Sequence, residues 1–274
     1  MSAPSSAPPA PAVAFAGPLA HLGAVVLATA RSFVKRSNAY WIDVIRWPLF
    51  PLIYFATMRL TYAAAGQDTV AGANVAGFLL VGMFGFIIWS GTIWSGGYAV
   101  EYERAEGTIG ALFLSPASRA AVIAGYGLGG FVWMLPAFVV VTILGVAVGA
   151  RFNVAEPLAV AGAVLALLIA SLATGFAFAG LFVLSRRANL LANFVQLPGQ
   201  LLAGFLFPRA SLPEPLYALS NAVPAGHAID ALRASALGAA TLRDTLPALA
   251  LALGVSALYA LVGLLSLRKV EHAA

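Results

Sequence analysis

The chain has 274 residues, of which 61% are hydrophobic and 9% are charged, and its formal net charge is +5. Because soluble domains carry nearer a quarter of charged residues, this composition excludes a soluble globular protein. Cysteine is absent and only three histidines occur. We therefore expect no disulfide, no thiolate chemistry, and no metal site or cofactor held by this chain.

The N-terminal region reads as a tail followed by an amphipathic helix. Residues 1–18 are rich in Ser, Ala and Pro, which predicts a disordered cytoplasmic tail. A cleaved signal peptide is the alternative, although no basic segment opens the chain. From residue 19 to about 43, apolar residues alternate with cations at loosely helical spacing. This predicts a helix along the inner membrane surface, with an ordinary solvated segment as the alternative.

Six later stretches are nearly free of charge, and each exceeds the about 18 residues that a helix needs to cross roughly 30 Å of hydrocarbon. They cover residues 47–67, 69–100, 120–150, 157–185, 188–208 and 245–267. We therefore predict an all-α polytopic membrane protein with six transmembrane helices in one domain over residues 19–270. Prolines in the long segment 209–244 predict short external helices there instead of a further span.

The cations fix the predicted orientation. Ten lysines and arginines lie on the N-terminal side of the predicted spans, and four lie on the other side, Arg151, Arg209, Arg233 and Arg243. Short loops rich in Lys and Arg stay in the cytoplasm, so both termini are expected there. No basic stripe interleaved with aromatic residues occurs, so nucleic acid is not an expected partner.

The spans lack the groups that most membrane chemistry needs. They contain no acidic residue and one clear cation, Arg59, which argues against an ion-coupled carrier. Gly125, Tyr126 and Gly127 resemble a potassium filter, but they open a long span, so helix packing through Gly125 and Gly129 is favoured. We find no nucleophile elbow, zinc-protease motif or phosphate-binding loop. The chain is not expected to be an enzyme, and energy for any work must come from a partner.

The cytoplasmic loop between the second and third predicted spans is a candidate docking element. After an acidic cluster at Glu101, Glu103 and Glu106, three apolar residues fall on one face of a short helix that ends before Pro116. Such a helix presents an apolar ridge to a groove on another protein. An ordinary interfacial loop helix is the alternative.

Two stretches carry a family resemblance. The run from Glu103 to Pro116 resembles the cytoplasmic loop of type-2 ABC transporter permeases. The run from Gly204 to Arg233 resembles the segment that closes the fifth span of that family and precedes the sixth, through Pro208, Pro213, Pro224, Asp230 and Arg233. The resemblance covers nearly all of residues 20–270, in the expected order of spans and loops.

The resemblance implies a half-transporter of the bacterial cytoplasmic membrane. Its partners would be a second permease subunit, taken to be identical, and two ATPase subunits that bind ATP and Mg²⁺. The residues implied in coupling to the ATPase are Glu101, Glu103, Arg104, Glu106, Gly107, Thr108, Leu112, Phe113 and Pro116. The chain departs from the pattern in its Ala/Pro-rich tail and in lacking an acidic substrate-facing residue.

The sequence does not identify the cargo. We expect export of an apolar or amphipathic molecule, drug-like or lipid-like, with four candidate lining residues, Trp89, Trp94, Tyr98 and Trp133. Aromatic residues at span ends also serve as interface anchors. Export of a polysaccharide or lipid-linked glycan is the alternative, and outside this class an ion channel or a membrane scaffold. In the external segment, Asp230 and Arg233 are predicted to form an ion pair at i and i+3.

Overall fold

The computed structural model describes residues 17–39, 41–108, 117–184 and 188–273. The tail predicted over residues 1–18 lies almost wholly outside these ranges, and Pro18 already begins the first helix. The predicted docking helix, with Leu112, Phe113 and Pro116, also lies outside the described residues.

The described chain is almost entirely helical, which confirms the all-α prediction. The helices are α1 (Pro18–Asn38), α2 (Trp41–Ala64), α3 (Val75–Thr92), α4 (Ala99–Ala105), α6 (Arg119–Trp133), α7 (Leu135–Ala147), α8 (Pro157–Leu184), α9 (Ala188–Leu202), α10 (Glu214–Ser220), α11 (Pro224–Leu237) and α12 (Leu242–Ala273). The other elements are a π-helical turn η1 (Ile93–Gly97), a 3-10 turn η2 (Arg209–Ser211), and the antiparallel strands β1 (Thr69–Val70) and β2 (Ala73–Asn74), with Thr69 opposite Asn74.

Four helical segments within the described ranges are long and apolar enough to cross a membrane. They are Val75–Gly97, Arg119–Ala147, Pro157–Phe182 and Leu242–Leu267. The fifth predicted span is shorter than expected, because α9 has 15 residues and gives way to a turn after Leu202. The count of six spans therefore stays a prediction, whereas a helical membrane protein is what the structure shows.

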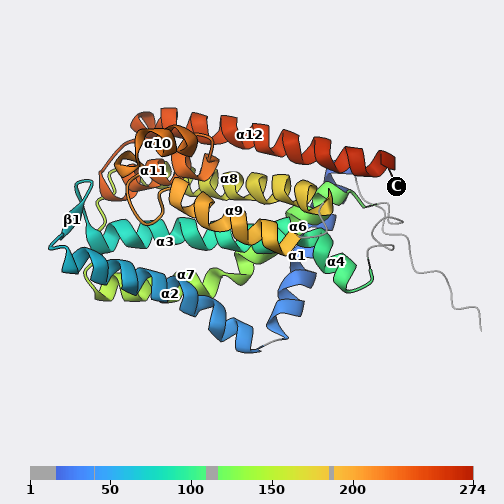
Figure 1. Ribbon diagram of the computed structural model, residues 1–274, viewed down its shortest axis with the longest axis horizontal. Coiled ribbons are helices and arrows are strands. Elements are labelled where there is room, and N and C mark those ends of the chain that lie inside the picture. The colour runs from blue at the N-terminus through green and yellow to red at the C-terminus, as the bar shows by residue number, and fades with distance from the viewer. Residues whose placement is uncertain (1–16, 40, 109–116, 185–187, 274) are drawn as a thin grey trace, which may run out of the picture.

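The long helices share one direction and α1 does not (Figure 1). Helices α3, α8 and α12 run along the long axis of the molecule, with α3 at the centre and 94% of its apolar window buried. Helix α1 crosses that axis at the end where α4 lies, and the hairpin, α10 and α11 lie at the opposite end. We call these the α1–α4 end and the hairpin end. The crosswise direction of α1 is what a helix lying along a membrane surface requires.

Local chemistry sets where the central helices begin and bend. The second predicted span starts six residues late because residues 69–74 form the hairpin, where Ala71 and Gly72 have φ values of 49° and 79°. The Asn74 side chain then accepts a hydrogen bond from the backbone N–H of Gly77 and caps α3. The third span breaks between α6 and α7 at Met134, two residues before a proline that cannot donate a helical hydrogen bond.

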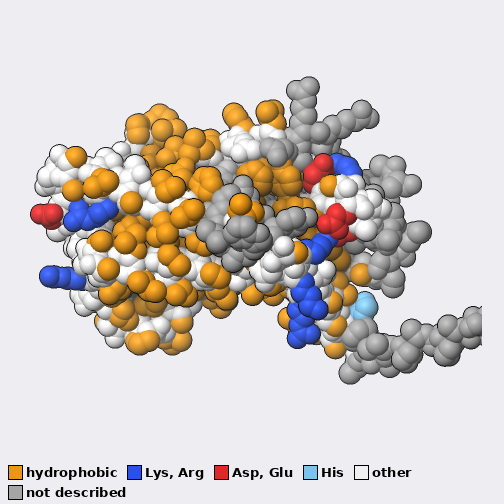
Figure 2. All heavy atoms as spheres, turned by 90° about the horizontal axis from the view of Figure 1, so that it is seen from below, with side chains coloured by type: hydrophobic (Ala, Val, Ile, Leu, Met, Phe, Trp, Pro, Cys, Tyr) orange, Lys and Arg blue, Asp and Glu red, His pale blue; other side chains and the backbone are white. Residues whose placement is uncertain are grey.

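Charged side chains gather at the two ends of the molecule, and the surface between them is mostly apolar (Figure 2). Helix α1 packs on α6 through small residues. A Cβ added at Gly125 would lie 2.6 Å from Thr29 Cβ, and one added at Gly129 would lie 2.9 Å from the Ala30 carbonyl oxygen. This confirms that Gly125 and Gly129 serve helix packing.

Candidate functional site: a polar cluster, two cavities and an arginine hub

A polar cluster joins α1, α4 and α6 at the α1–α4 end. Arg36 Nη1 donates to Glu106 Oε2 at 2.7 Å, and its Nη2 donates to the hydroxyl of Tyr126. That hydroxyl donates to Glu103 Oε1, and Thr108 Oγ1 donates to Glu103 Oε2. The cluster therefore connects the segment that carries the predicted docking residues to two helices of the bundle.

Aromatic packing supports these hydrogen bonds. The rings of Tyr102 and Tyr126 stack with centroids 6.2 Å apart and planes 7° apart, and Phe33 meets both rings edge-on. The Arg36 guanidinium carbon lies 5.4 Å from the Tyr126 ring centroid, within the range of a cation–π interaction. The ring of Tyr126 is almost fully buried, so its hydroxyl is held in one place.

Six of the nine coupling residues named from the sequence are described by the structure, and they fall into this region. Glu101 and Arg104 pair with each other at 2.6 Å, one turn apart on α4. Gly107 has a φ of 71°, a conformation that favours glycine, in the turn that follows the helix. Each of the three acidic side chains thus has a partner within the chain, and the Glu106 side chain is still 48% exposed.

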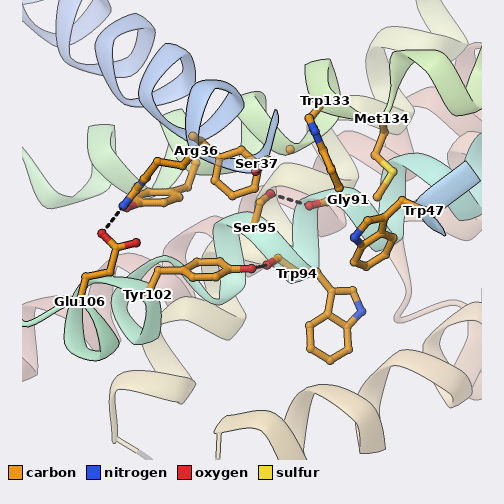
Figure 3. A pocket seen from close by; sticks show the side chains of 13 residues that line it. Arg36, Ser37, Trp47, Gly91, Trp94, Ser95, Tyr102, Glu106, Trp133 and Met134 are labelled. Carbon is orange, nitrogen blue, oxygen red and sulfur yellow. Dashed lines mark hydrogen bonds and ion pairs between the residues drawn. The ribbon is translucent and has the colours of Figure 1, made fainter. Parts of the chain in front are cut away.

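Beside the cluster lies a cavity of about 220 Å³, which we call the α1 cavity (Figure 3). Six aromatic residues line it, Phe33, Trp47, Trp94, Tyr102, Tyr126 and Trp133. The ion pair of Arg36 with Glu106 stands on one side of it, and Trp47 and Trp94 stand on the other. The cavity is therefore apolar in body and charged at one edge.

A larger cavity of about 520 Å³, the α9 cavity, lies between α2, α3 and α9. Its aromatic lining includes Trp47, Tyr54 and Phe86, and its polar lining consists of Ser90, Asn193, Gln196 and Gln200. Gln196 and Gln200 donate to Ser90 Oγ at 3.1 and 3.4 Å. The buried Oε1 of Gln196 has no hydrogen-bond partner within the described chain. Among the residues that the structure describes, those that line this cavity include none with a charge.

The four aromatic residues proposed from the sequence to line a cargo path take different positions. Trp94 lines both cavities and Trp133 lines the α1 cavity, where its Nε1 donates to Asn38 Oδ1 at 3.0 Å. Trp89 and Tyr98 are buried in side-chain packing and line neither cavity. Their cargo role stays a prediction, and the structure brings only Trp94 and Trp133 to a cavity.

At the hairpin end, the external segment is organised around buried Arg209. Its Nε donates to Ser220 Oγ at 3.1 Å, and its Nη2 donates to Asn221 Oδ1 at 2.6 Å. Its Nη1 donates to Asp230 Oδ2 at 2.9 Å and lies 3.4 Å from His227 Nδ1. Arg209 thus ties η2, α10 and α11 together, with Pro208, Pro213 and Pro224 next to the starts of these elements.

The predicted ion pair between Asp230 and Arg233 is wrong. Asp230 pairs with Arg209, whereas Arg233 turns inward and donates to the carbonyl oxygens of Gly204 and Phe205 at 2.6 and 2.7 Å. Its guanidinium carbon lies 3.7 Å from the Phe78 ring centroid. Burial lowers the pKa of Arg233 to about 10, and the negative charge of nearby Asp230 partly offsets this decrease. The two residues share a helix, but the turn after α9 offers Arg233 carbonyls that have no helical partner.

The profile of the ABC-2 type transporter family matches residues 22–237, a range that includes the polar cluster, both cavities and the arginine hub. The chain belongs to the ABC-2 type transporter family. No curated protein matches it. Membership makes the chain the permease component of an ABC transporter, and it implies an assembly with an ATPase partner.

Several residues of this ABC-2 permease that form its sites were not singled out from the sequence. Arg36 and Arg209 were counted only as loop cations, and Tyr126 was weighed only within a filter motif. Gln196 and Gln200 carried a usable signal, because two amides at i and i+4 inside an apolar stretch lie on one helix face. Amides in such a position mark a helix face that meets other polar groups.

Proposed function

We propose that this ABC-2 permease works in an ATP-driven exporter of the bacterial cytoplasmic membrane, with both termini in the cytoplasm. Two copies would pair with each other and with two ATPase subunits, which bind ATP and Mg²⁺. The observation that carries the proposal is the polar cluster, in which Glu103 and Glu106 are bonded through Tyr126 and Arg36 to α6 and α1. A displacement of the docking loop by an ATPase would therefore pull directly on the bundle.

The α9 cavity supports an uncharged amphipathic cargo. Its aromatic side chains suit an apolar body, and its amides suit hydroxyl or amide groups. A charged cargo would leave its charge unpaired there, which is unfavourable in a low-dielectric site. Gln196 lines this cavity, and its amide is the group we propose to hydrogen-bond a cargo hydroxyl. The same combination of rings and amides suits the face of a sugar, so a lipid-linked glycan is the second candidate.

ATP hydrolysis by the reconstituted complex tests the cargo class. Diacylglycerol should stimulate hydrolysis, and phosphatidic acid with the same acyl chains should stimulate it less. Gln196→Leu should raise the half-stimulating concentration several-fold, since one hydrogen bond contributes about 1 kcal/mol. Gln67→Leu, in a loop at the hairpin end, should leave it unchanged. Equal stimulation by both lipids would contradict an uncharged cargo, and stimulation by a lipid-linked glycan alone would favour the second candidate.

A further inference from the structure

The two cavities share a wall. Trp47, Trp94 and Met134 line both of them, and these residues come from α2, η1 and the break between α6 and α7. Two cavities that use the same three side chains are adjacent, and these side chains form the wall that they share.

The position of Trp94 depends on the π-helical turn η1. A π turn adds a residue to a helical turn and redirects the side chains that follow, and such turns are frequent at functional sites. The Ser95 hydroxyl donates to the Gly91 carbonyl, and the Tyr102 hydroxyl donates to the Trp94 carbonyl at 3.3 Å (Figure 3). Trp94 is therefore held by its own turn and by α4, the helix that leads to the predicted docking loop.

The cavities differ in chemistry in a way that suits successive steps. The α1 cavity has the ion pair of Arg36 with Glu106 at its edge, whereas neutral amides line the α9 cavity beside its aromatic rings. An amphipathic molecule can keep its polar group near the charged edge while its apolar body enters between the rings. When the molecule has moved into the α9 cavity, the amides of Gln196 and Gln200 replace the hydrogen bonds that water made to its polar group.

We propose that the α1 cavity and the α9 cavity are consecutive sites on one cargo path, and that Trp94 separates them and limits the width of the cargo that passes. The inference rests on the proposed export of an uncharged amphipathic cargo. It adds a first binding site at the α1–α4 end and a residue that determines specificity. Because the Trp94 carbonyl accepts from Tyr102, movement of α4 reaches this wall directly.

Cysteine labelling tests the path without any ATPase. The natural chain has no cysteine, so Ser37→Cys reports on the α1 cavity and Ser90→Cys reports on the α9 cavity. The permease in sealed vesicles is treated from the α1–α4 side with an uncharged, membrane-impermeant glucosyl methanethiosulfonate reagent. Ser37→Cys should react readily, and Ser90→Cys should react slowly.

Adding Trp94→Ala should speed the reaction of Ser90→Cys about tenfold or more, which corresponds to about 1.4 kcal/mol in the barrier. Trp94→Phe should give a smaller increase, and it provides a second, more conservative test if the alanine variant misfolds. Phe152→Ala is the control, since half-exposed Phe152 lines neither cavity, and it should leave the Ser90→Cys rate unchanged. An unchanged rate in Trp94→Ala, or an equal rise in Phe152→Ala, would overturn the proposed path.

Transport by the complex with its ATPase separates this inference from the proposed function. Diacylglycerols with a small nitrobenzoxadiazole label and with a bulkier pyrene label serve as narrow and wide probes. Trp94→Ala should raise the transport of the wide probe relative to the narrow one. Absence of ATP-dependent transport in the parent complex would refute the proposed function, whatever the labelling shows. Transport in the parent with the same probe ratio in Trp94→Ala would refute the role of Trp94 alone.

Discussion

Replacing Tyr126 by Phe removes the hydroxyl that joins Arg36 to Glu103 and leaves the stacked ring in place. The hydroxyl donates to Glu103 and accepts from Arg36, so the variant loses two hydrogen bonds with charged partners. Because the ring keeps its packing on Tyr102 and Phe33, the change reports on the hydrogen bonds and not on a cavity.

The expected effect is modest because water can reach the partners. Hydrogen bonds to charged groups contribute about 1.5–3 kcal/mol each, which would sum to about 3–6 kcal/mol for two. The Arg36 side chain is 36% exposed and keeps its bond to Glu106, so we expect a net loss of about 1–3 kcal/mol. That loss would increase the opening of α4 from the bundle about 5- to 150-fold.

Amide hydrogen exchange of residues 101–108 in detergent measures this opening, and ATP hydrolysis per cargo moved measures its effect on coupling. Tyr98→Phe is the matched control, because the Tyr98 hydroxyl is buried without a hydrogen-bond partner within the described chain. Tyr98→Phe should raise the amide exchange rate of these residues by less than Tyr126→Phe does, or should lower it. The reason is that removing an unpaired buried group is nearly neutral or stabilising. Equal exchange in the two variants would refute the idea that the cluster holds the docking segment to the bundle.

Three further predictions concern the hairpin end, the core and the docking loop. Arg209→Met removes the ion pair with half-exposed Asp230 and the hydrogen bonds to Ser220 and Asn221, and it should lower the free energy of unfolding by about 2–4 kcal/mol. Thermal unfolding in detergent measures this loss, and a change below about 1 kcal/mol would contradict a structural hub. Gly82→Ala places a Cβ 1.8 Å from a backbone carbonyl oxygen and should lower the melting temperature, whereas Gly254→Ala, with nothing within 4 Å, should not. Replacing Glu103 and Glu106 by Gln should weaken co-purification of the ATPase, and unchanged co-purification would argue against a role in docking.

The sequence predicted the helices well where a single physical property decides them. Long uncharged runs predicted apolar helices, and the prolines of the external segment predicted the short helices found there. The hairpin over residues 69–74 was missed because a charge count cannot register a turn with positive φ inside an apolar run. The early end of α9 was missed because a charge count also cannot register the turn that follows this helix, where Gly204 has a φ of 72°.

The sites were predictable only in part. The acidic loop was visible, but its partners were not, because Arg36 is 70 positions from Glu106 and Tyr126 is 23 positions from Glu103. The spacing of Asp230 and Arg233 suggested a local pair, and the structure prefers Arg209, 21 positions away. Local spacing cannot show which side chain a distant turn brings closer. The cavities depend on contacts among helices that lie far apart in the sequence, which periodicity does not report.

ATP-dependent transport in proteoliposomes tests the central claim most directly. Vesicles would contain the permease alone, the permease with its ATPase, or the permease with an ATPase variant that binds but does not hydrolyse ATP. We predict that movement of labelled diacylglycerol exceeds its spontaneous movement in protein-free vesicles only where the active ATPase and ATP are present. Transport at the same rate by the permease alone would contradict the account, because the chain would then draw its driving force from elsewhere.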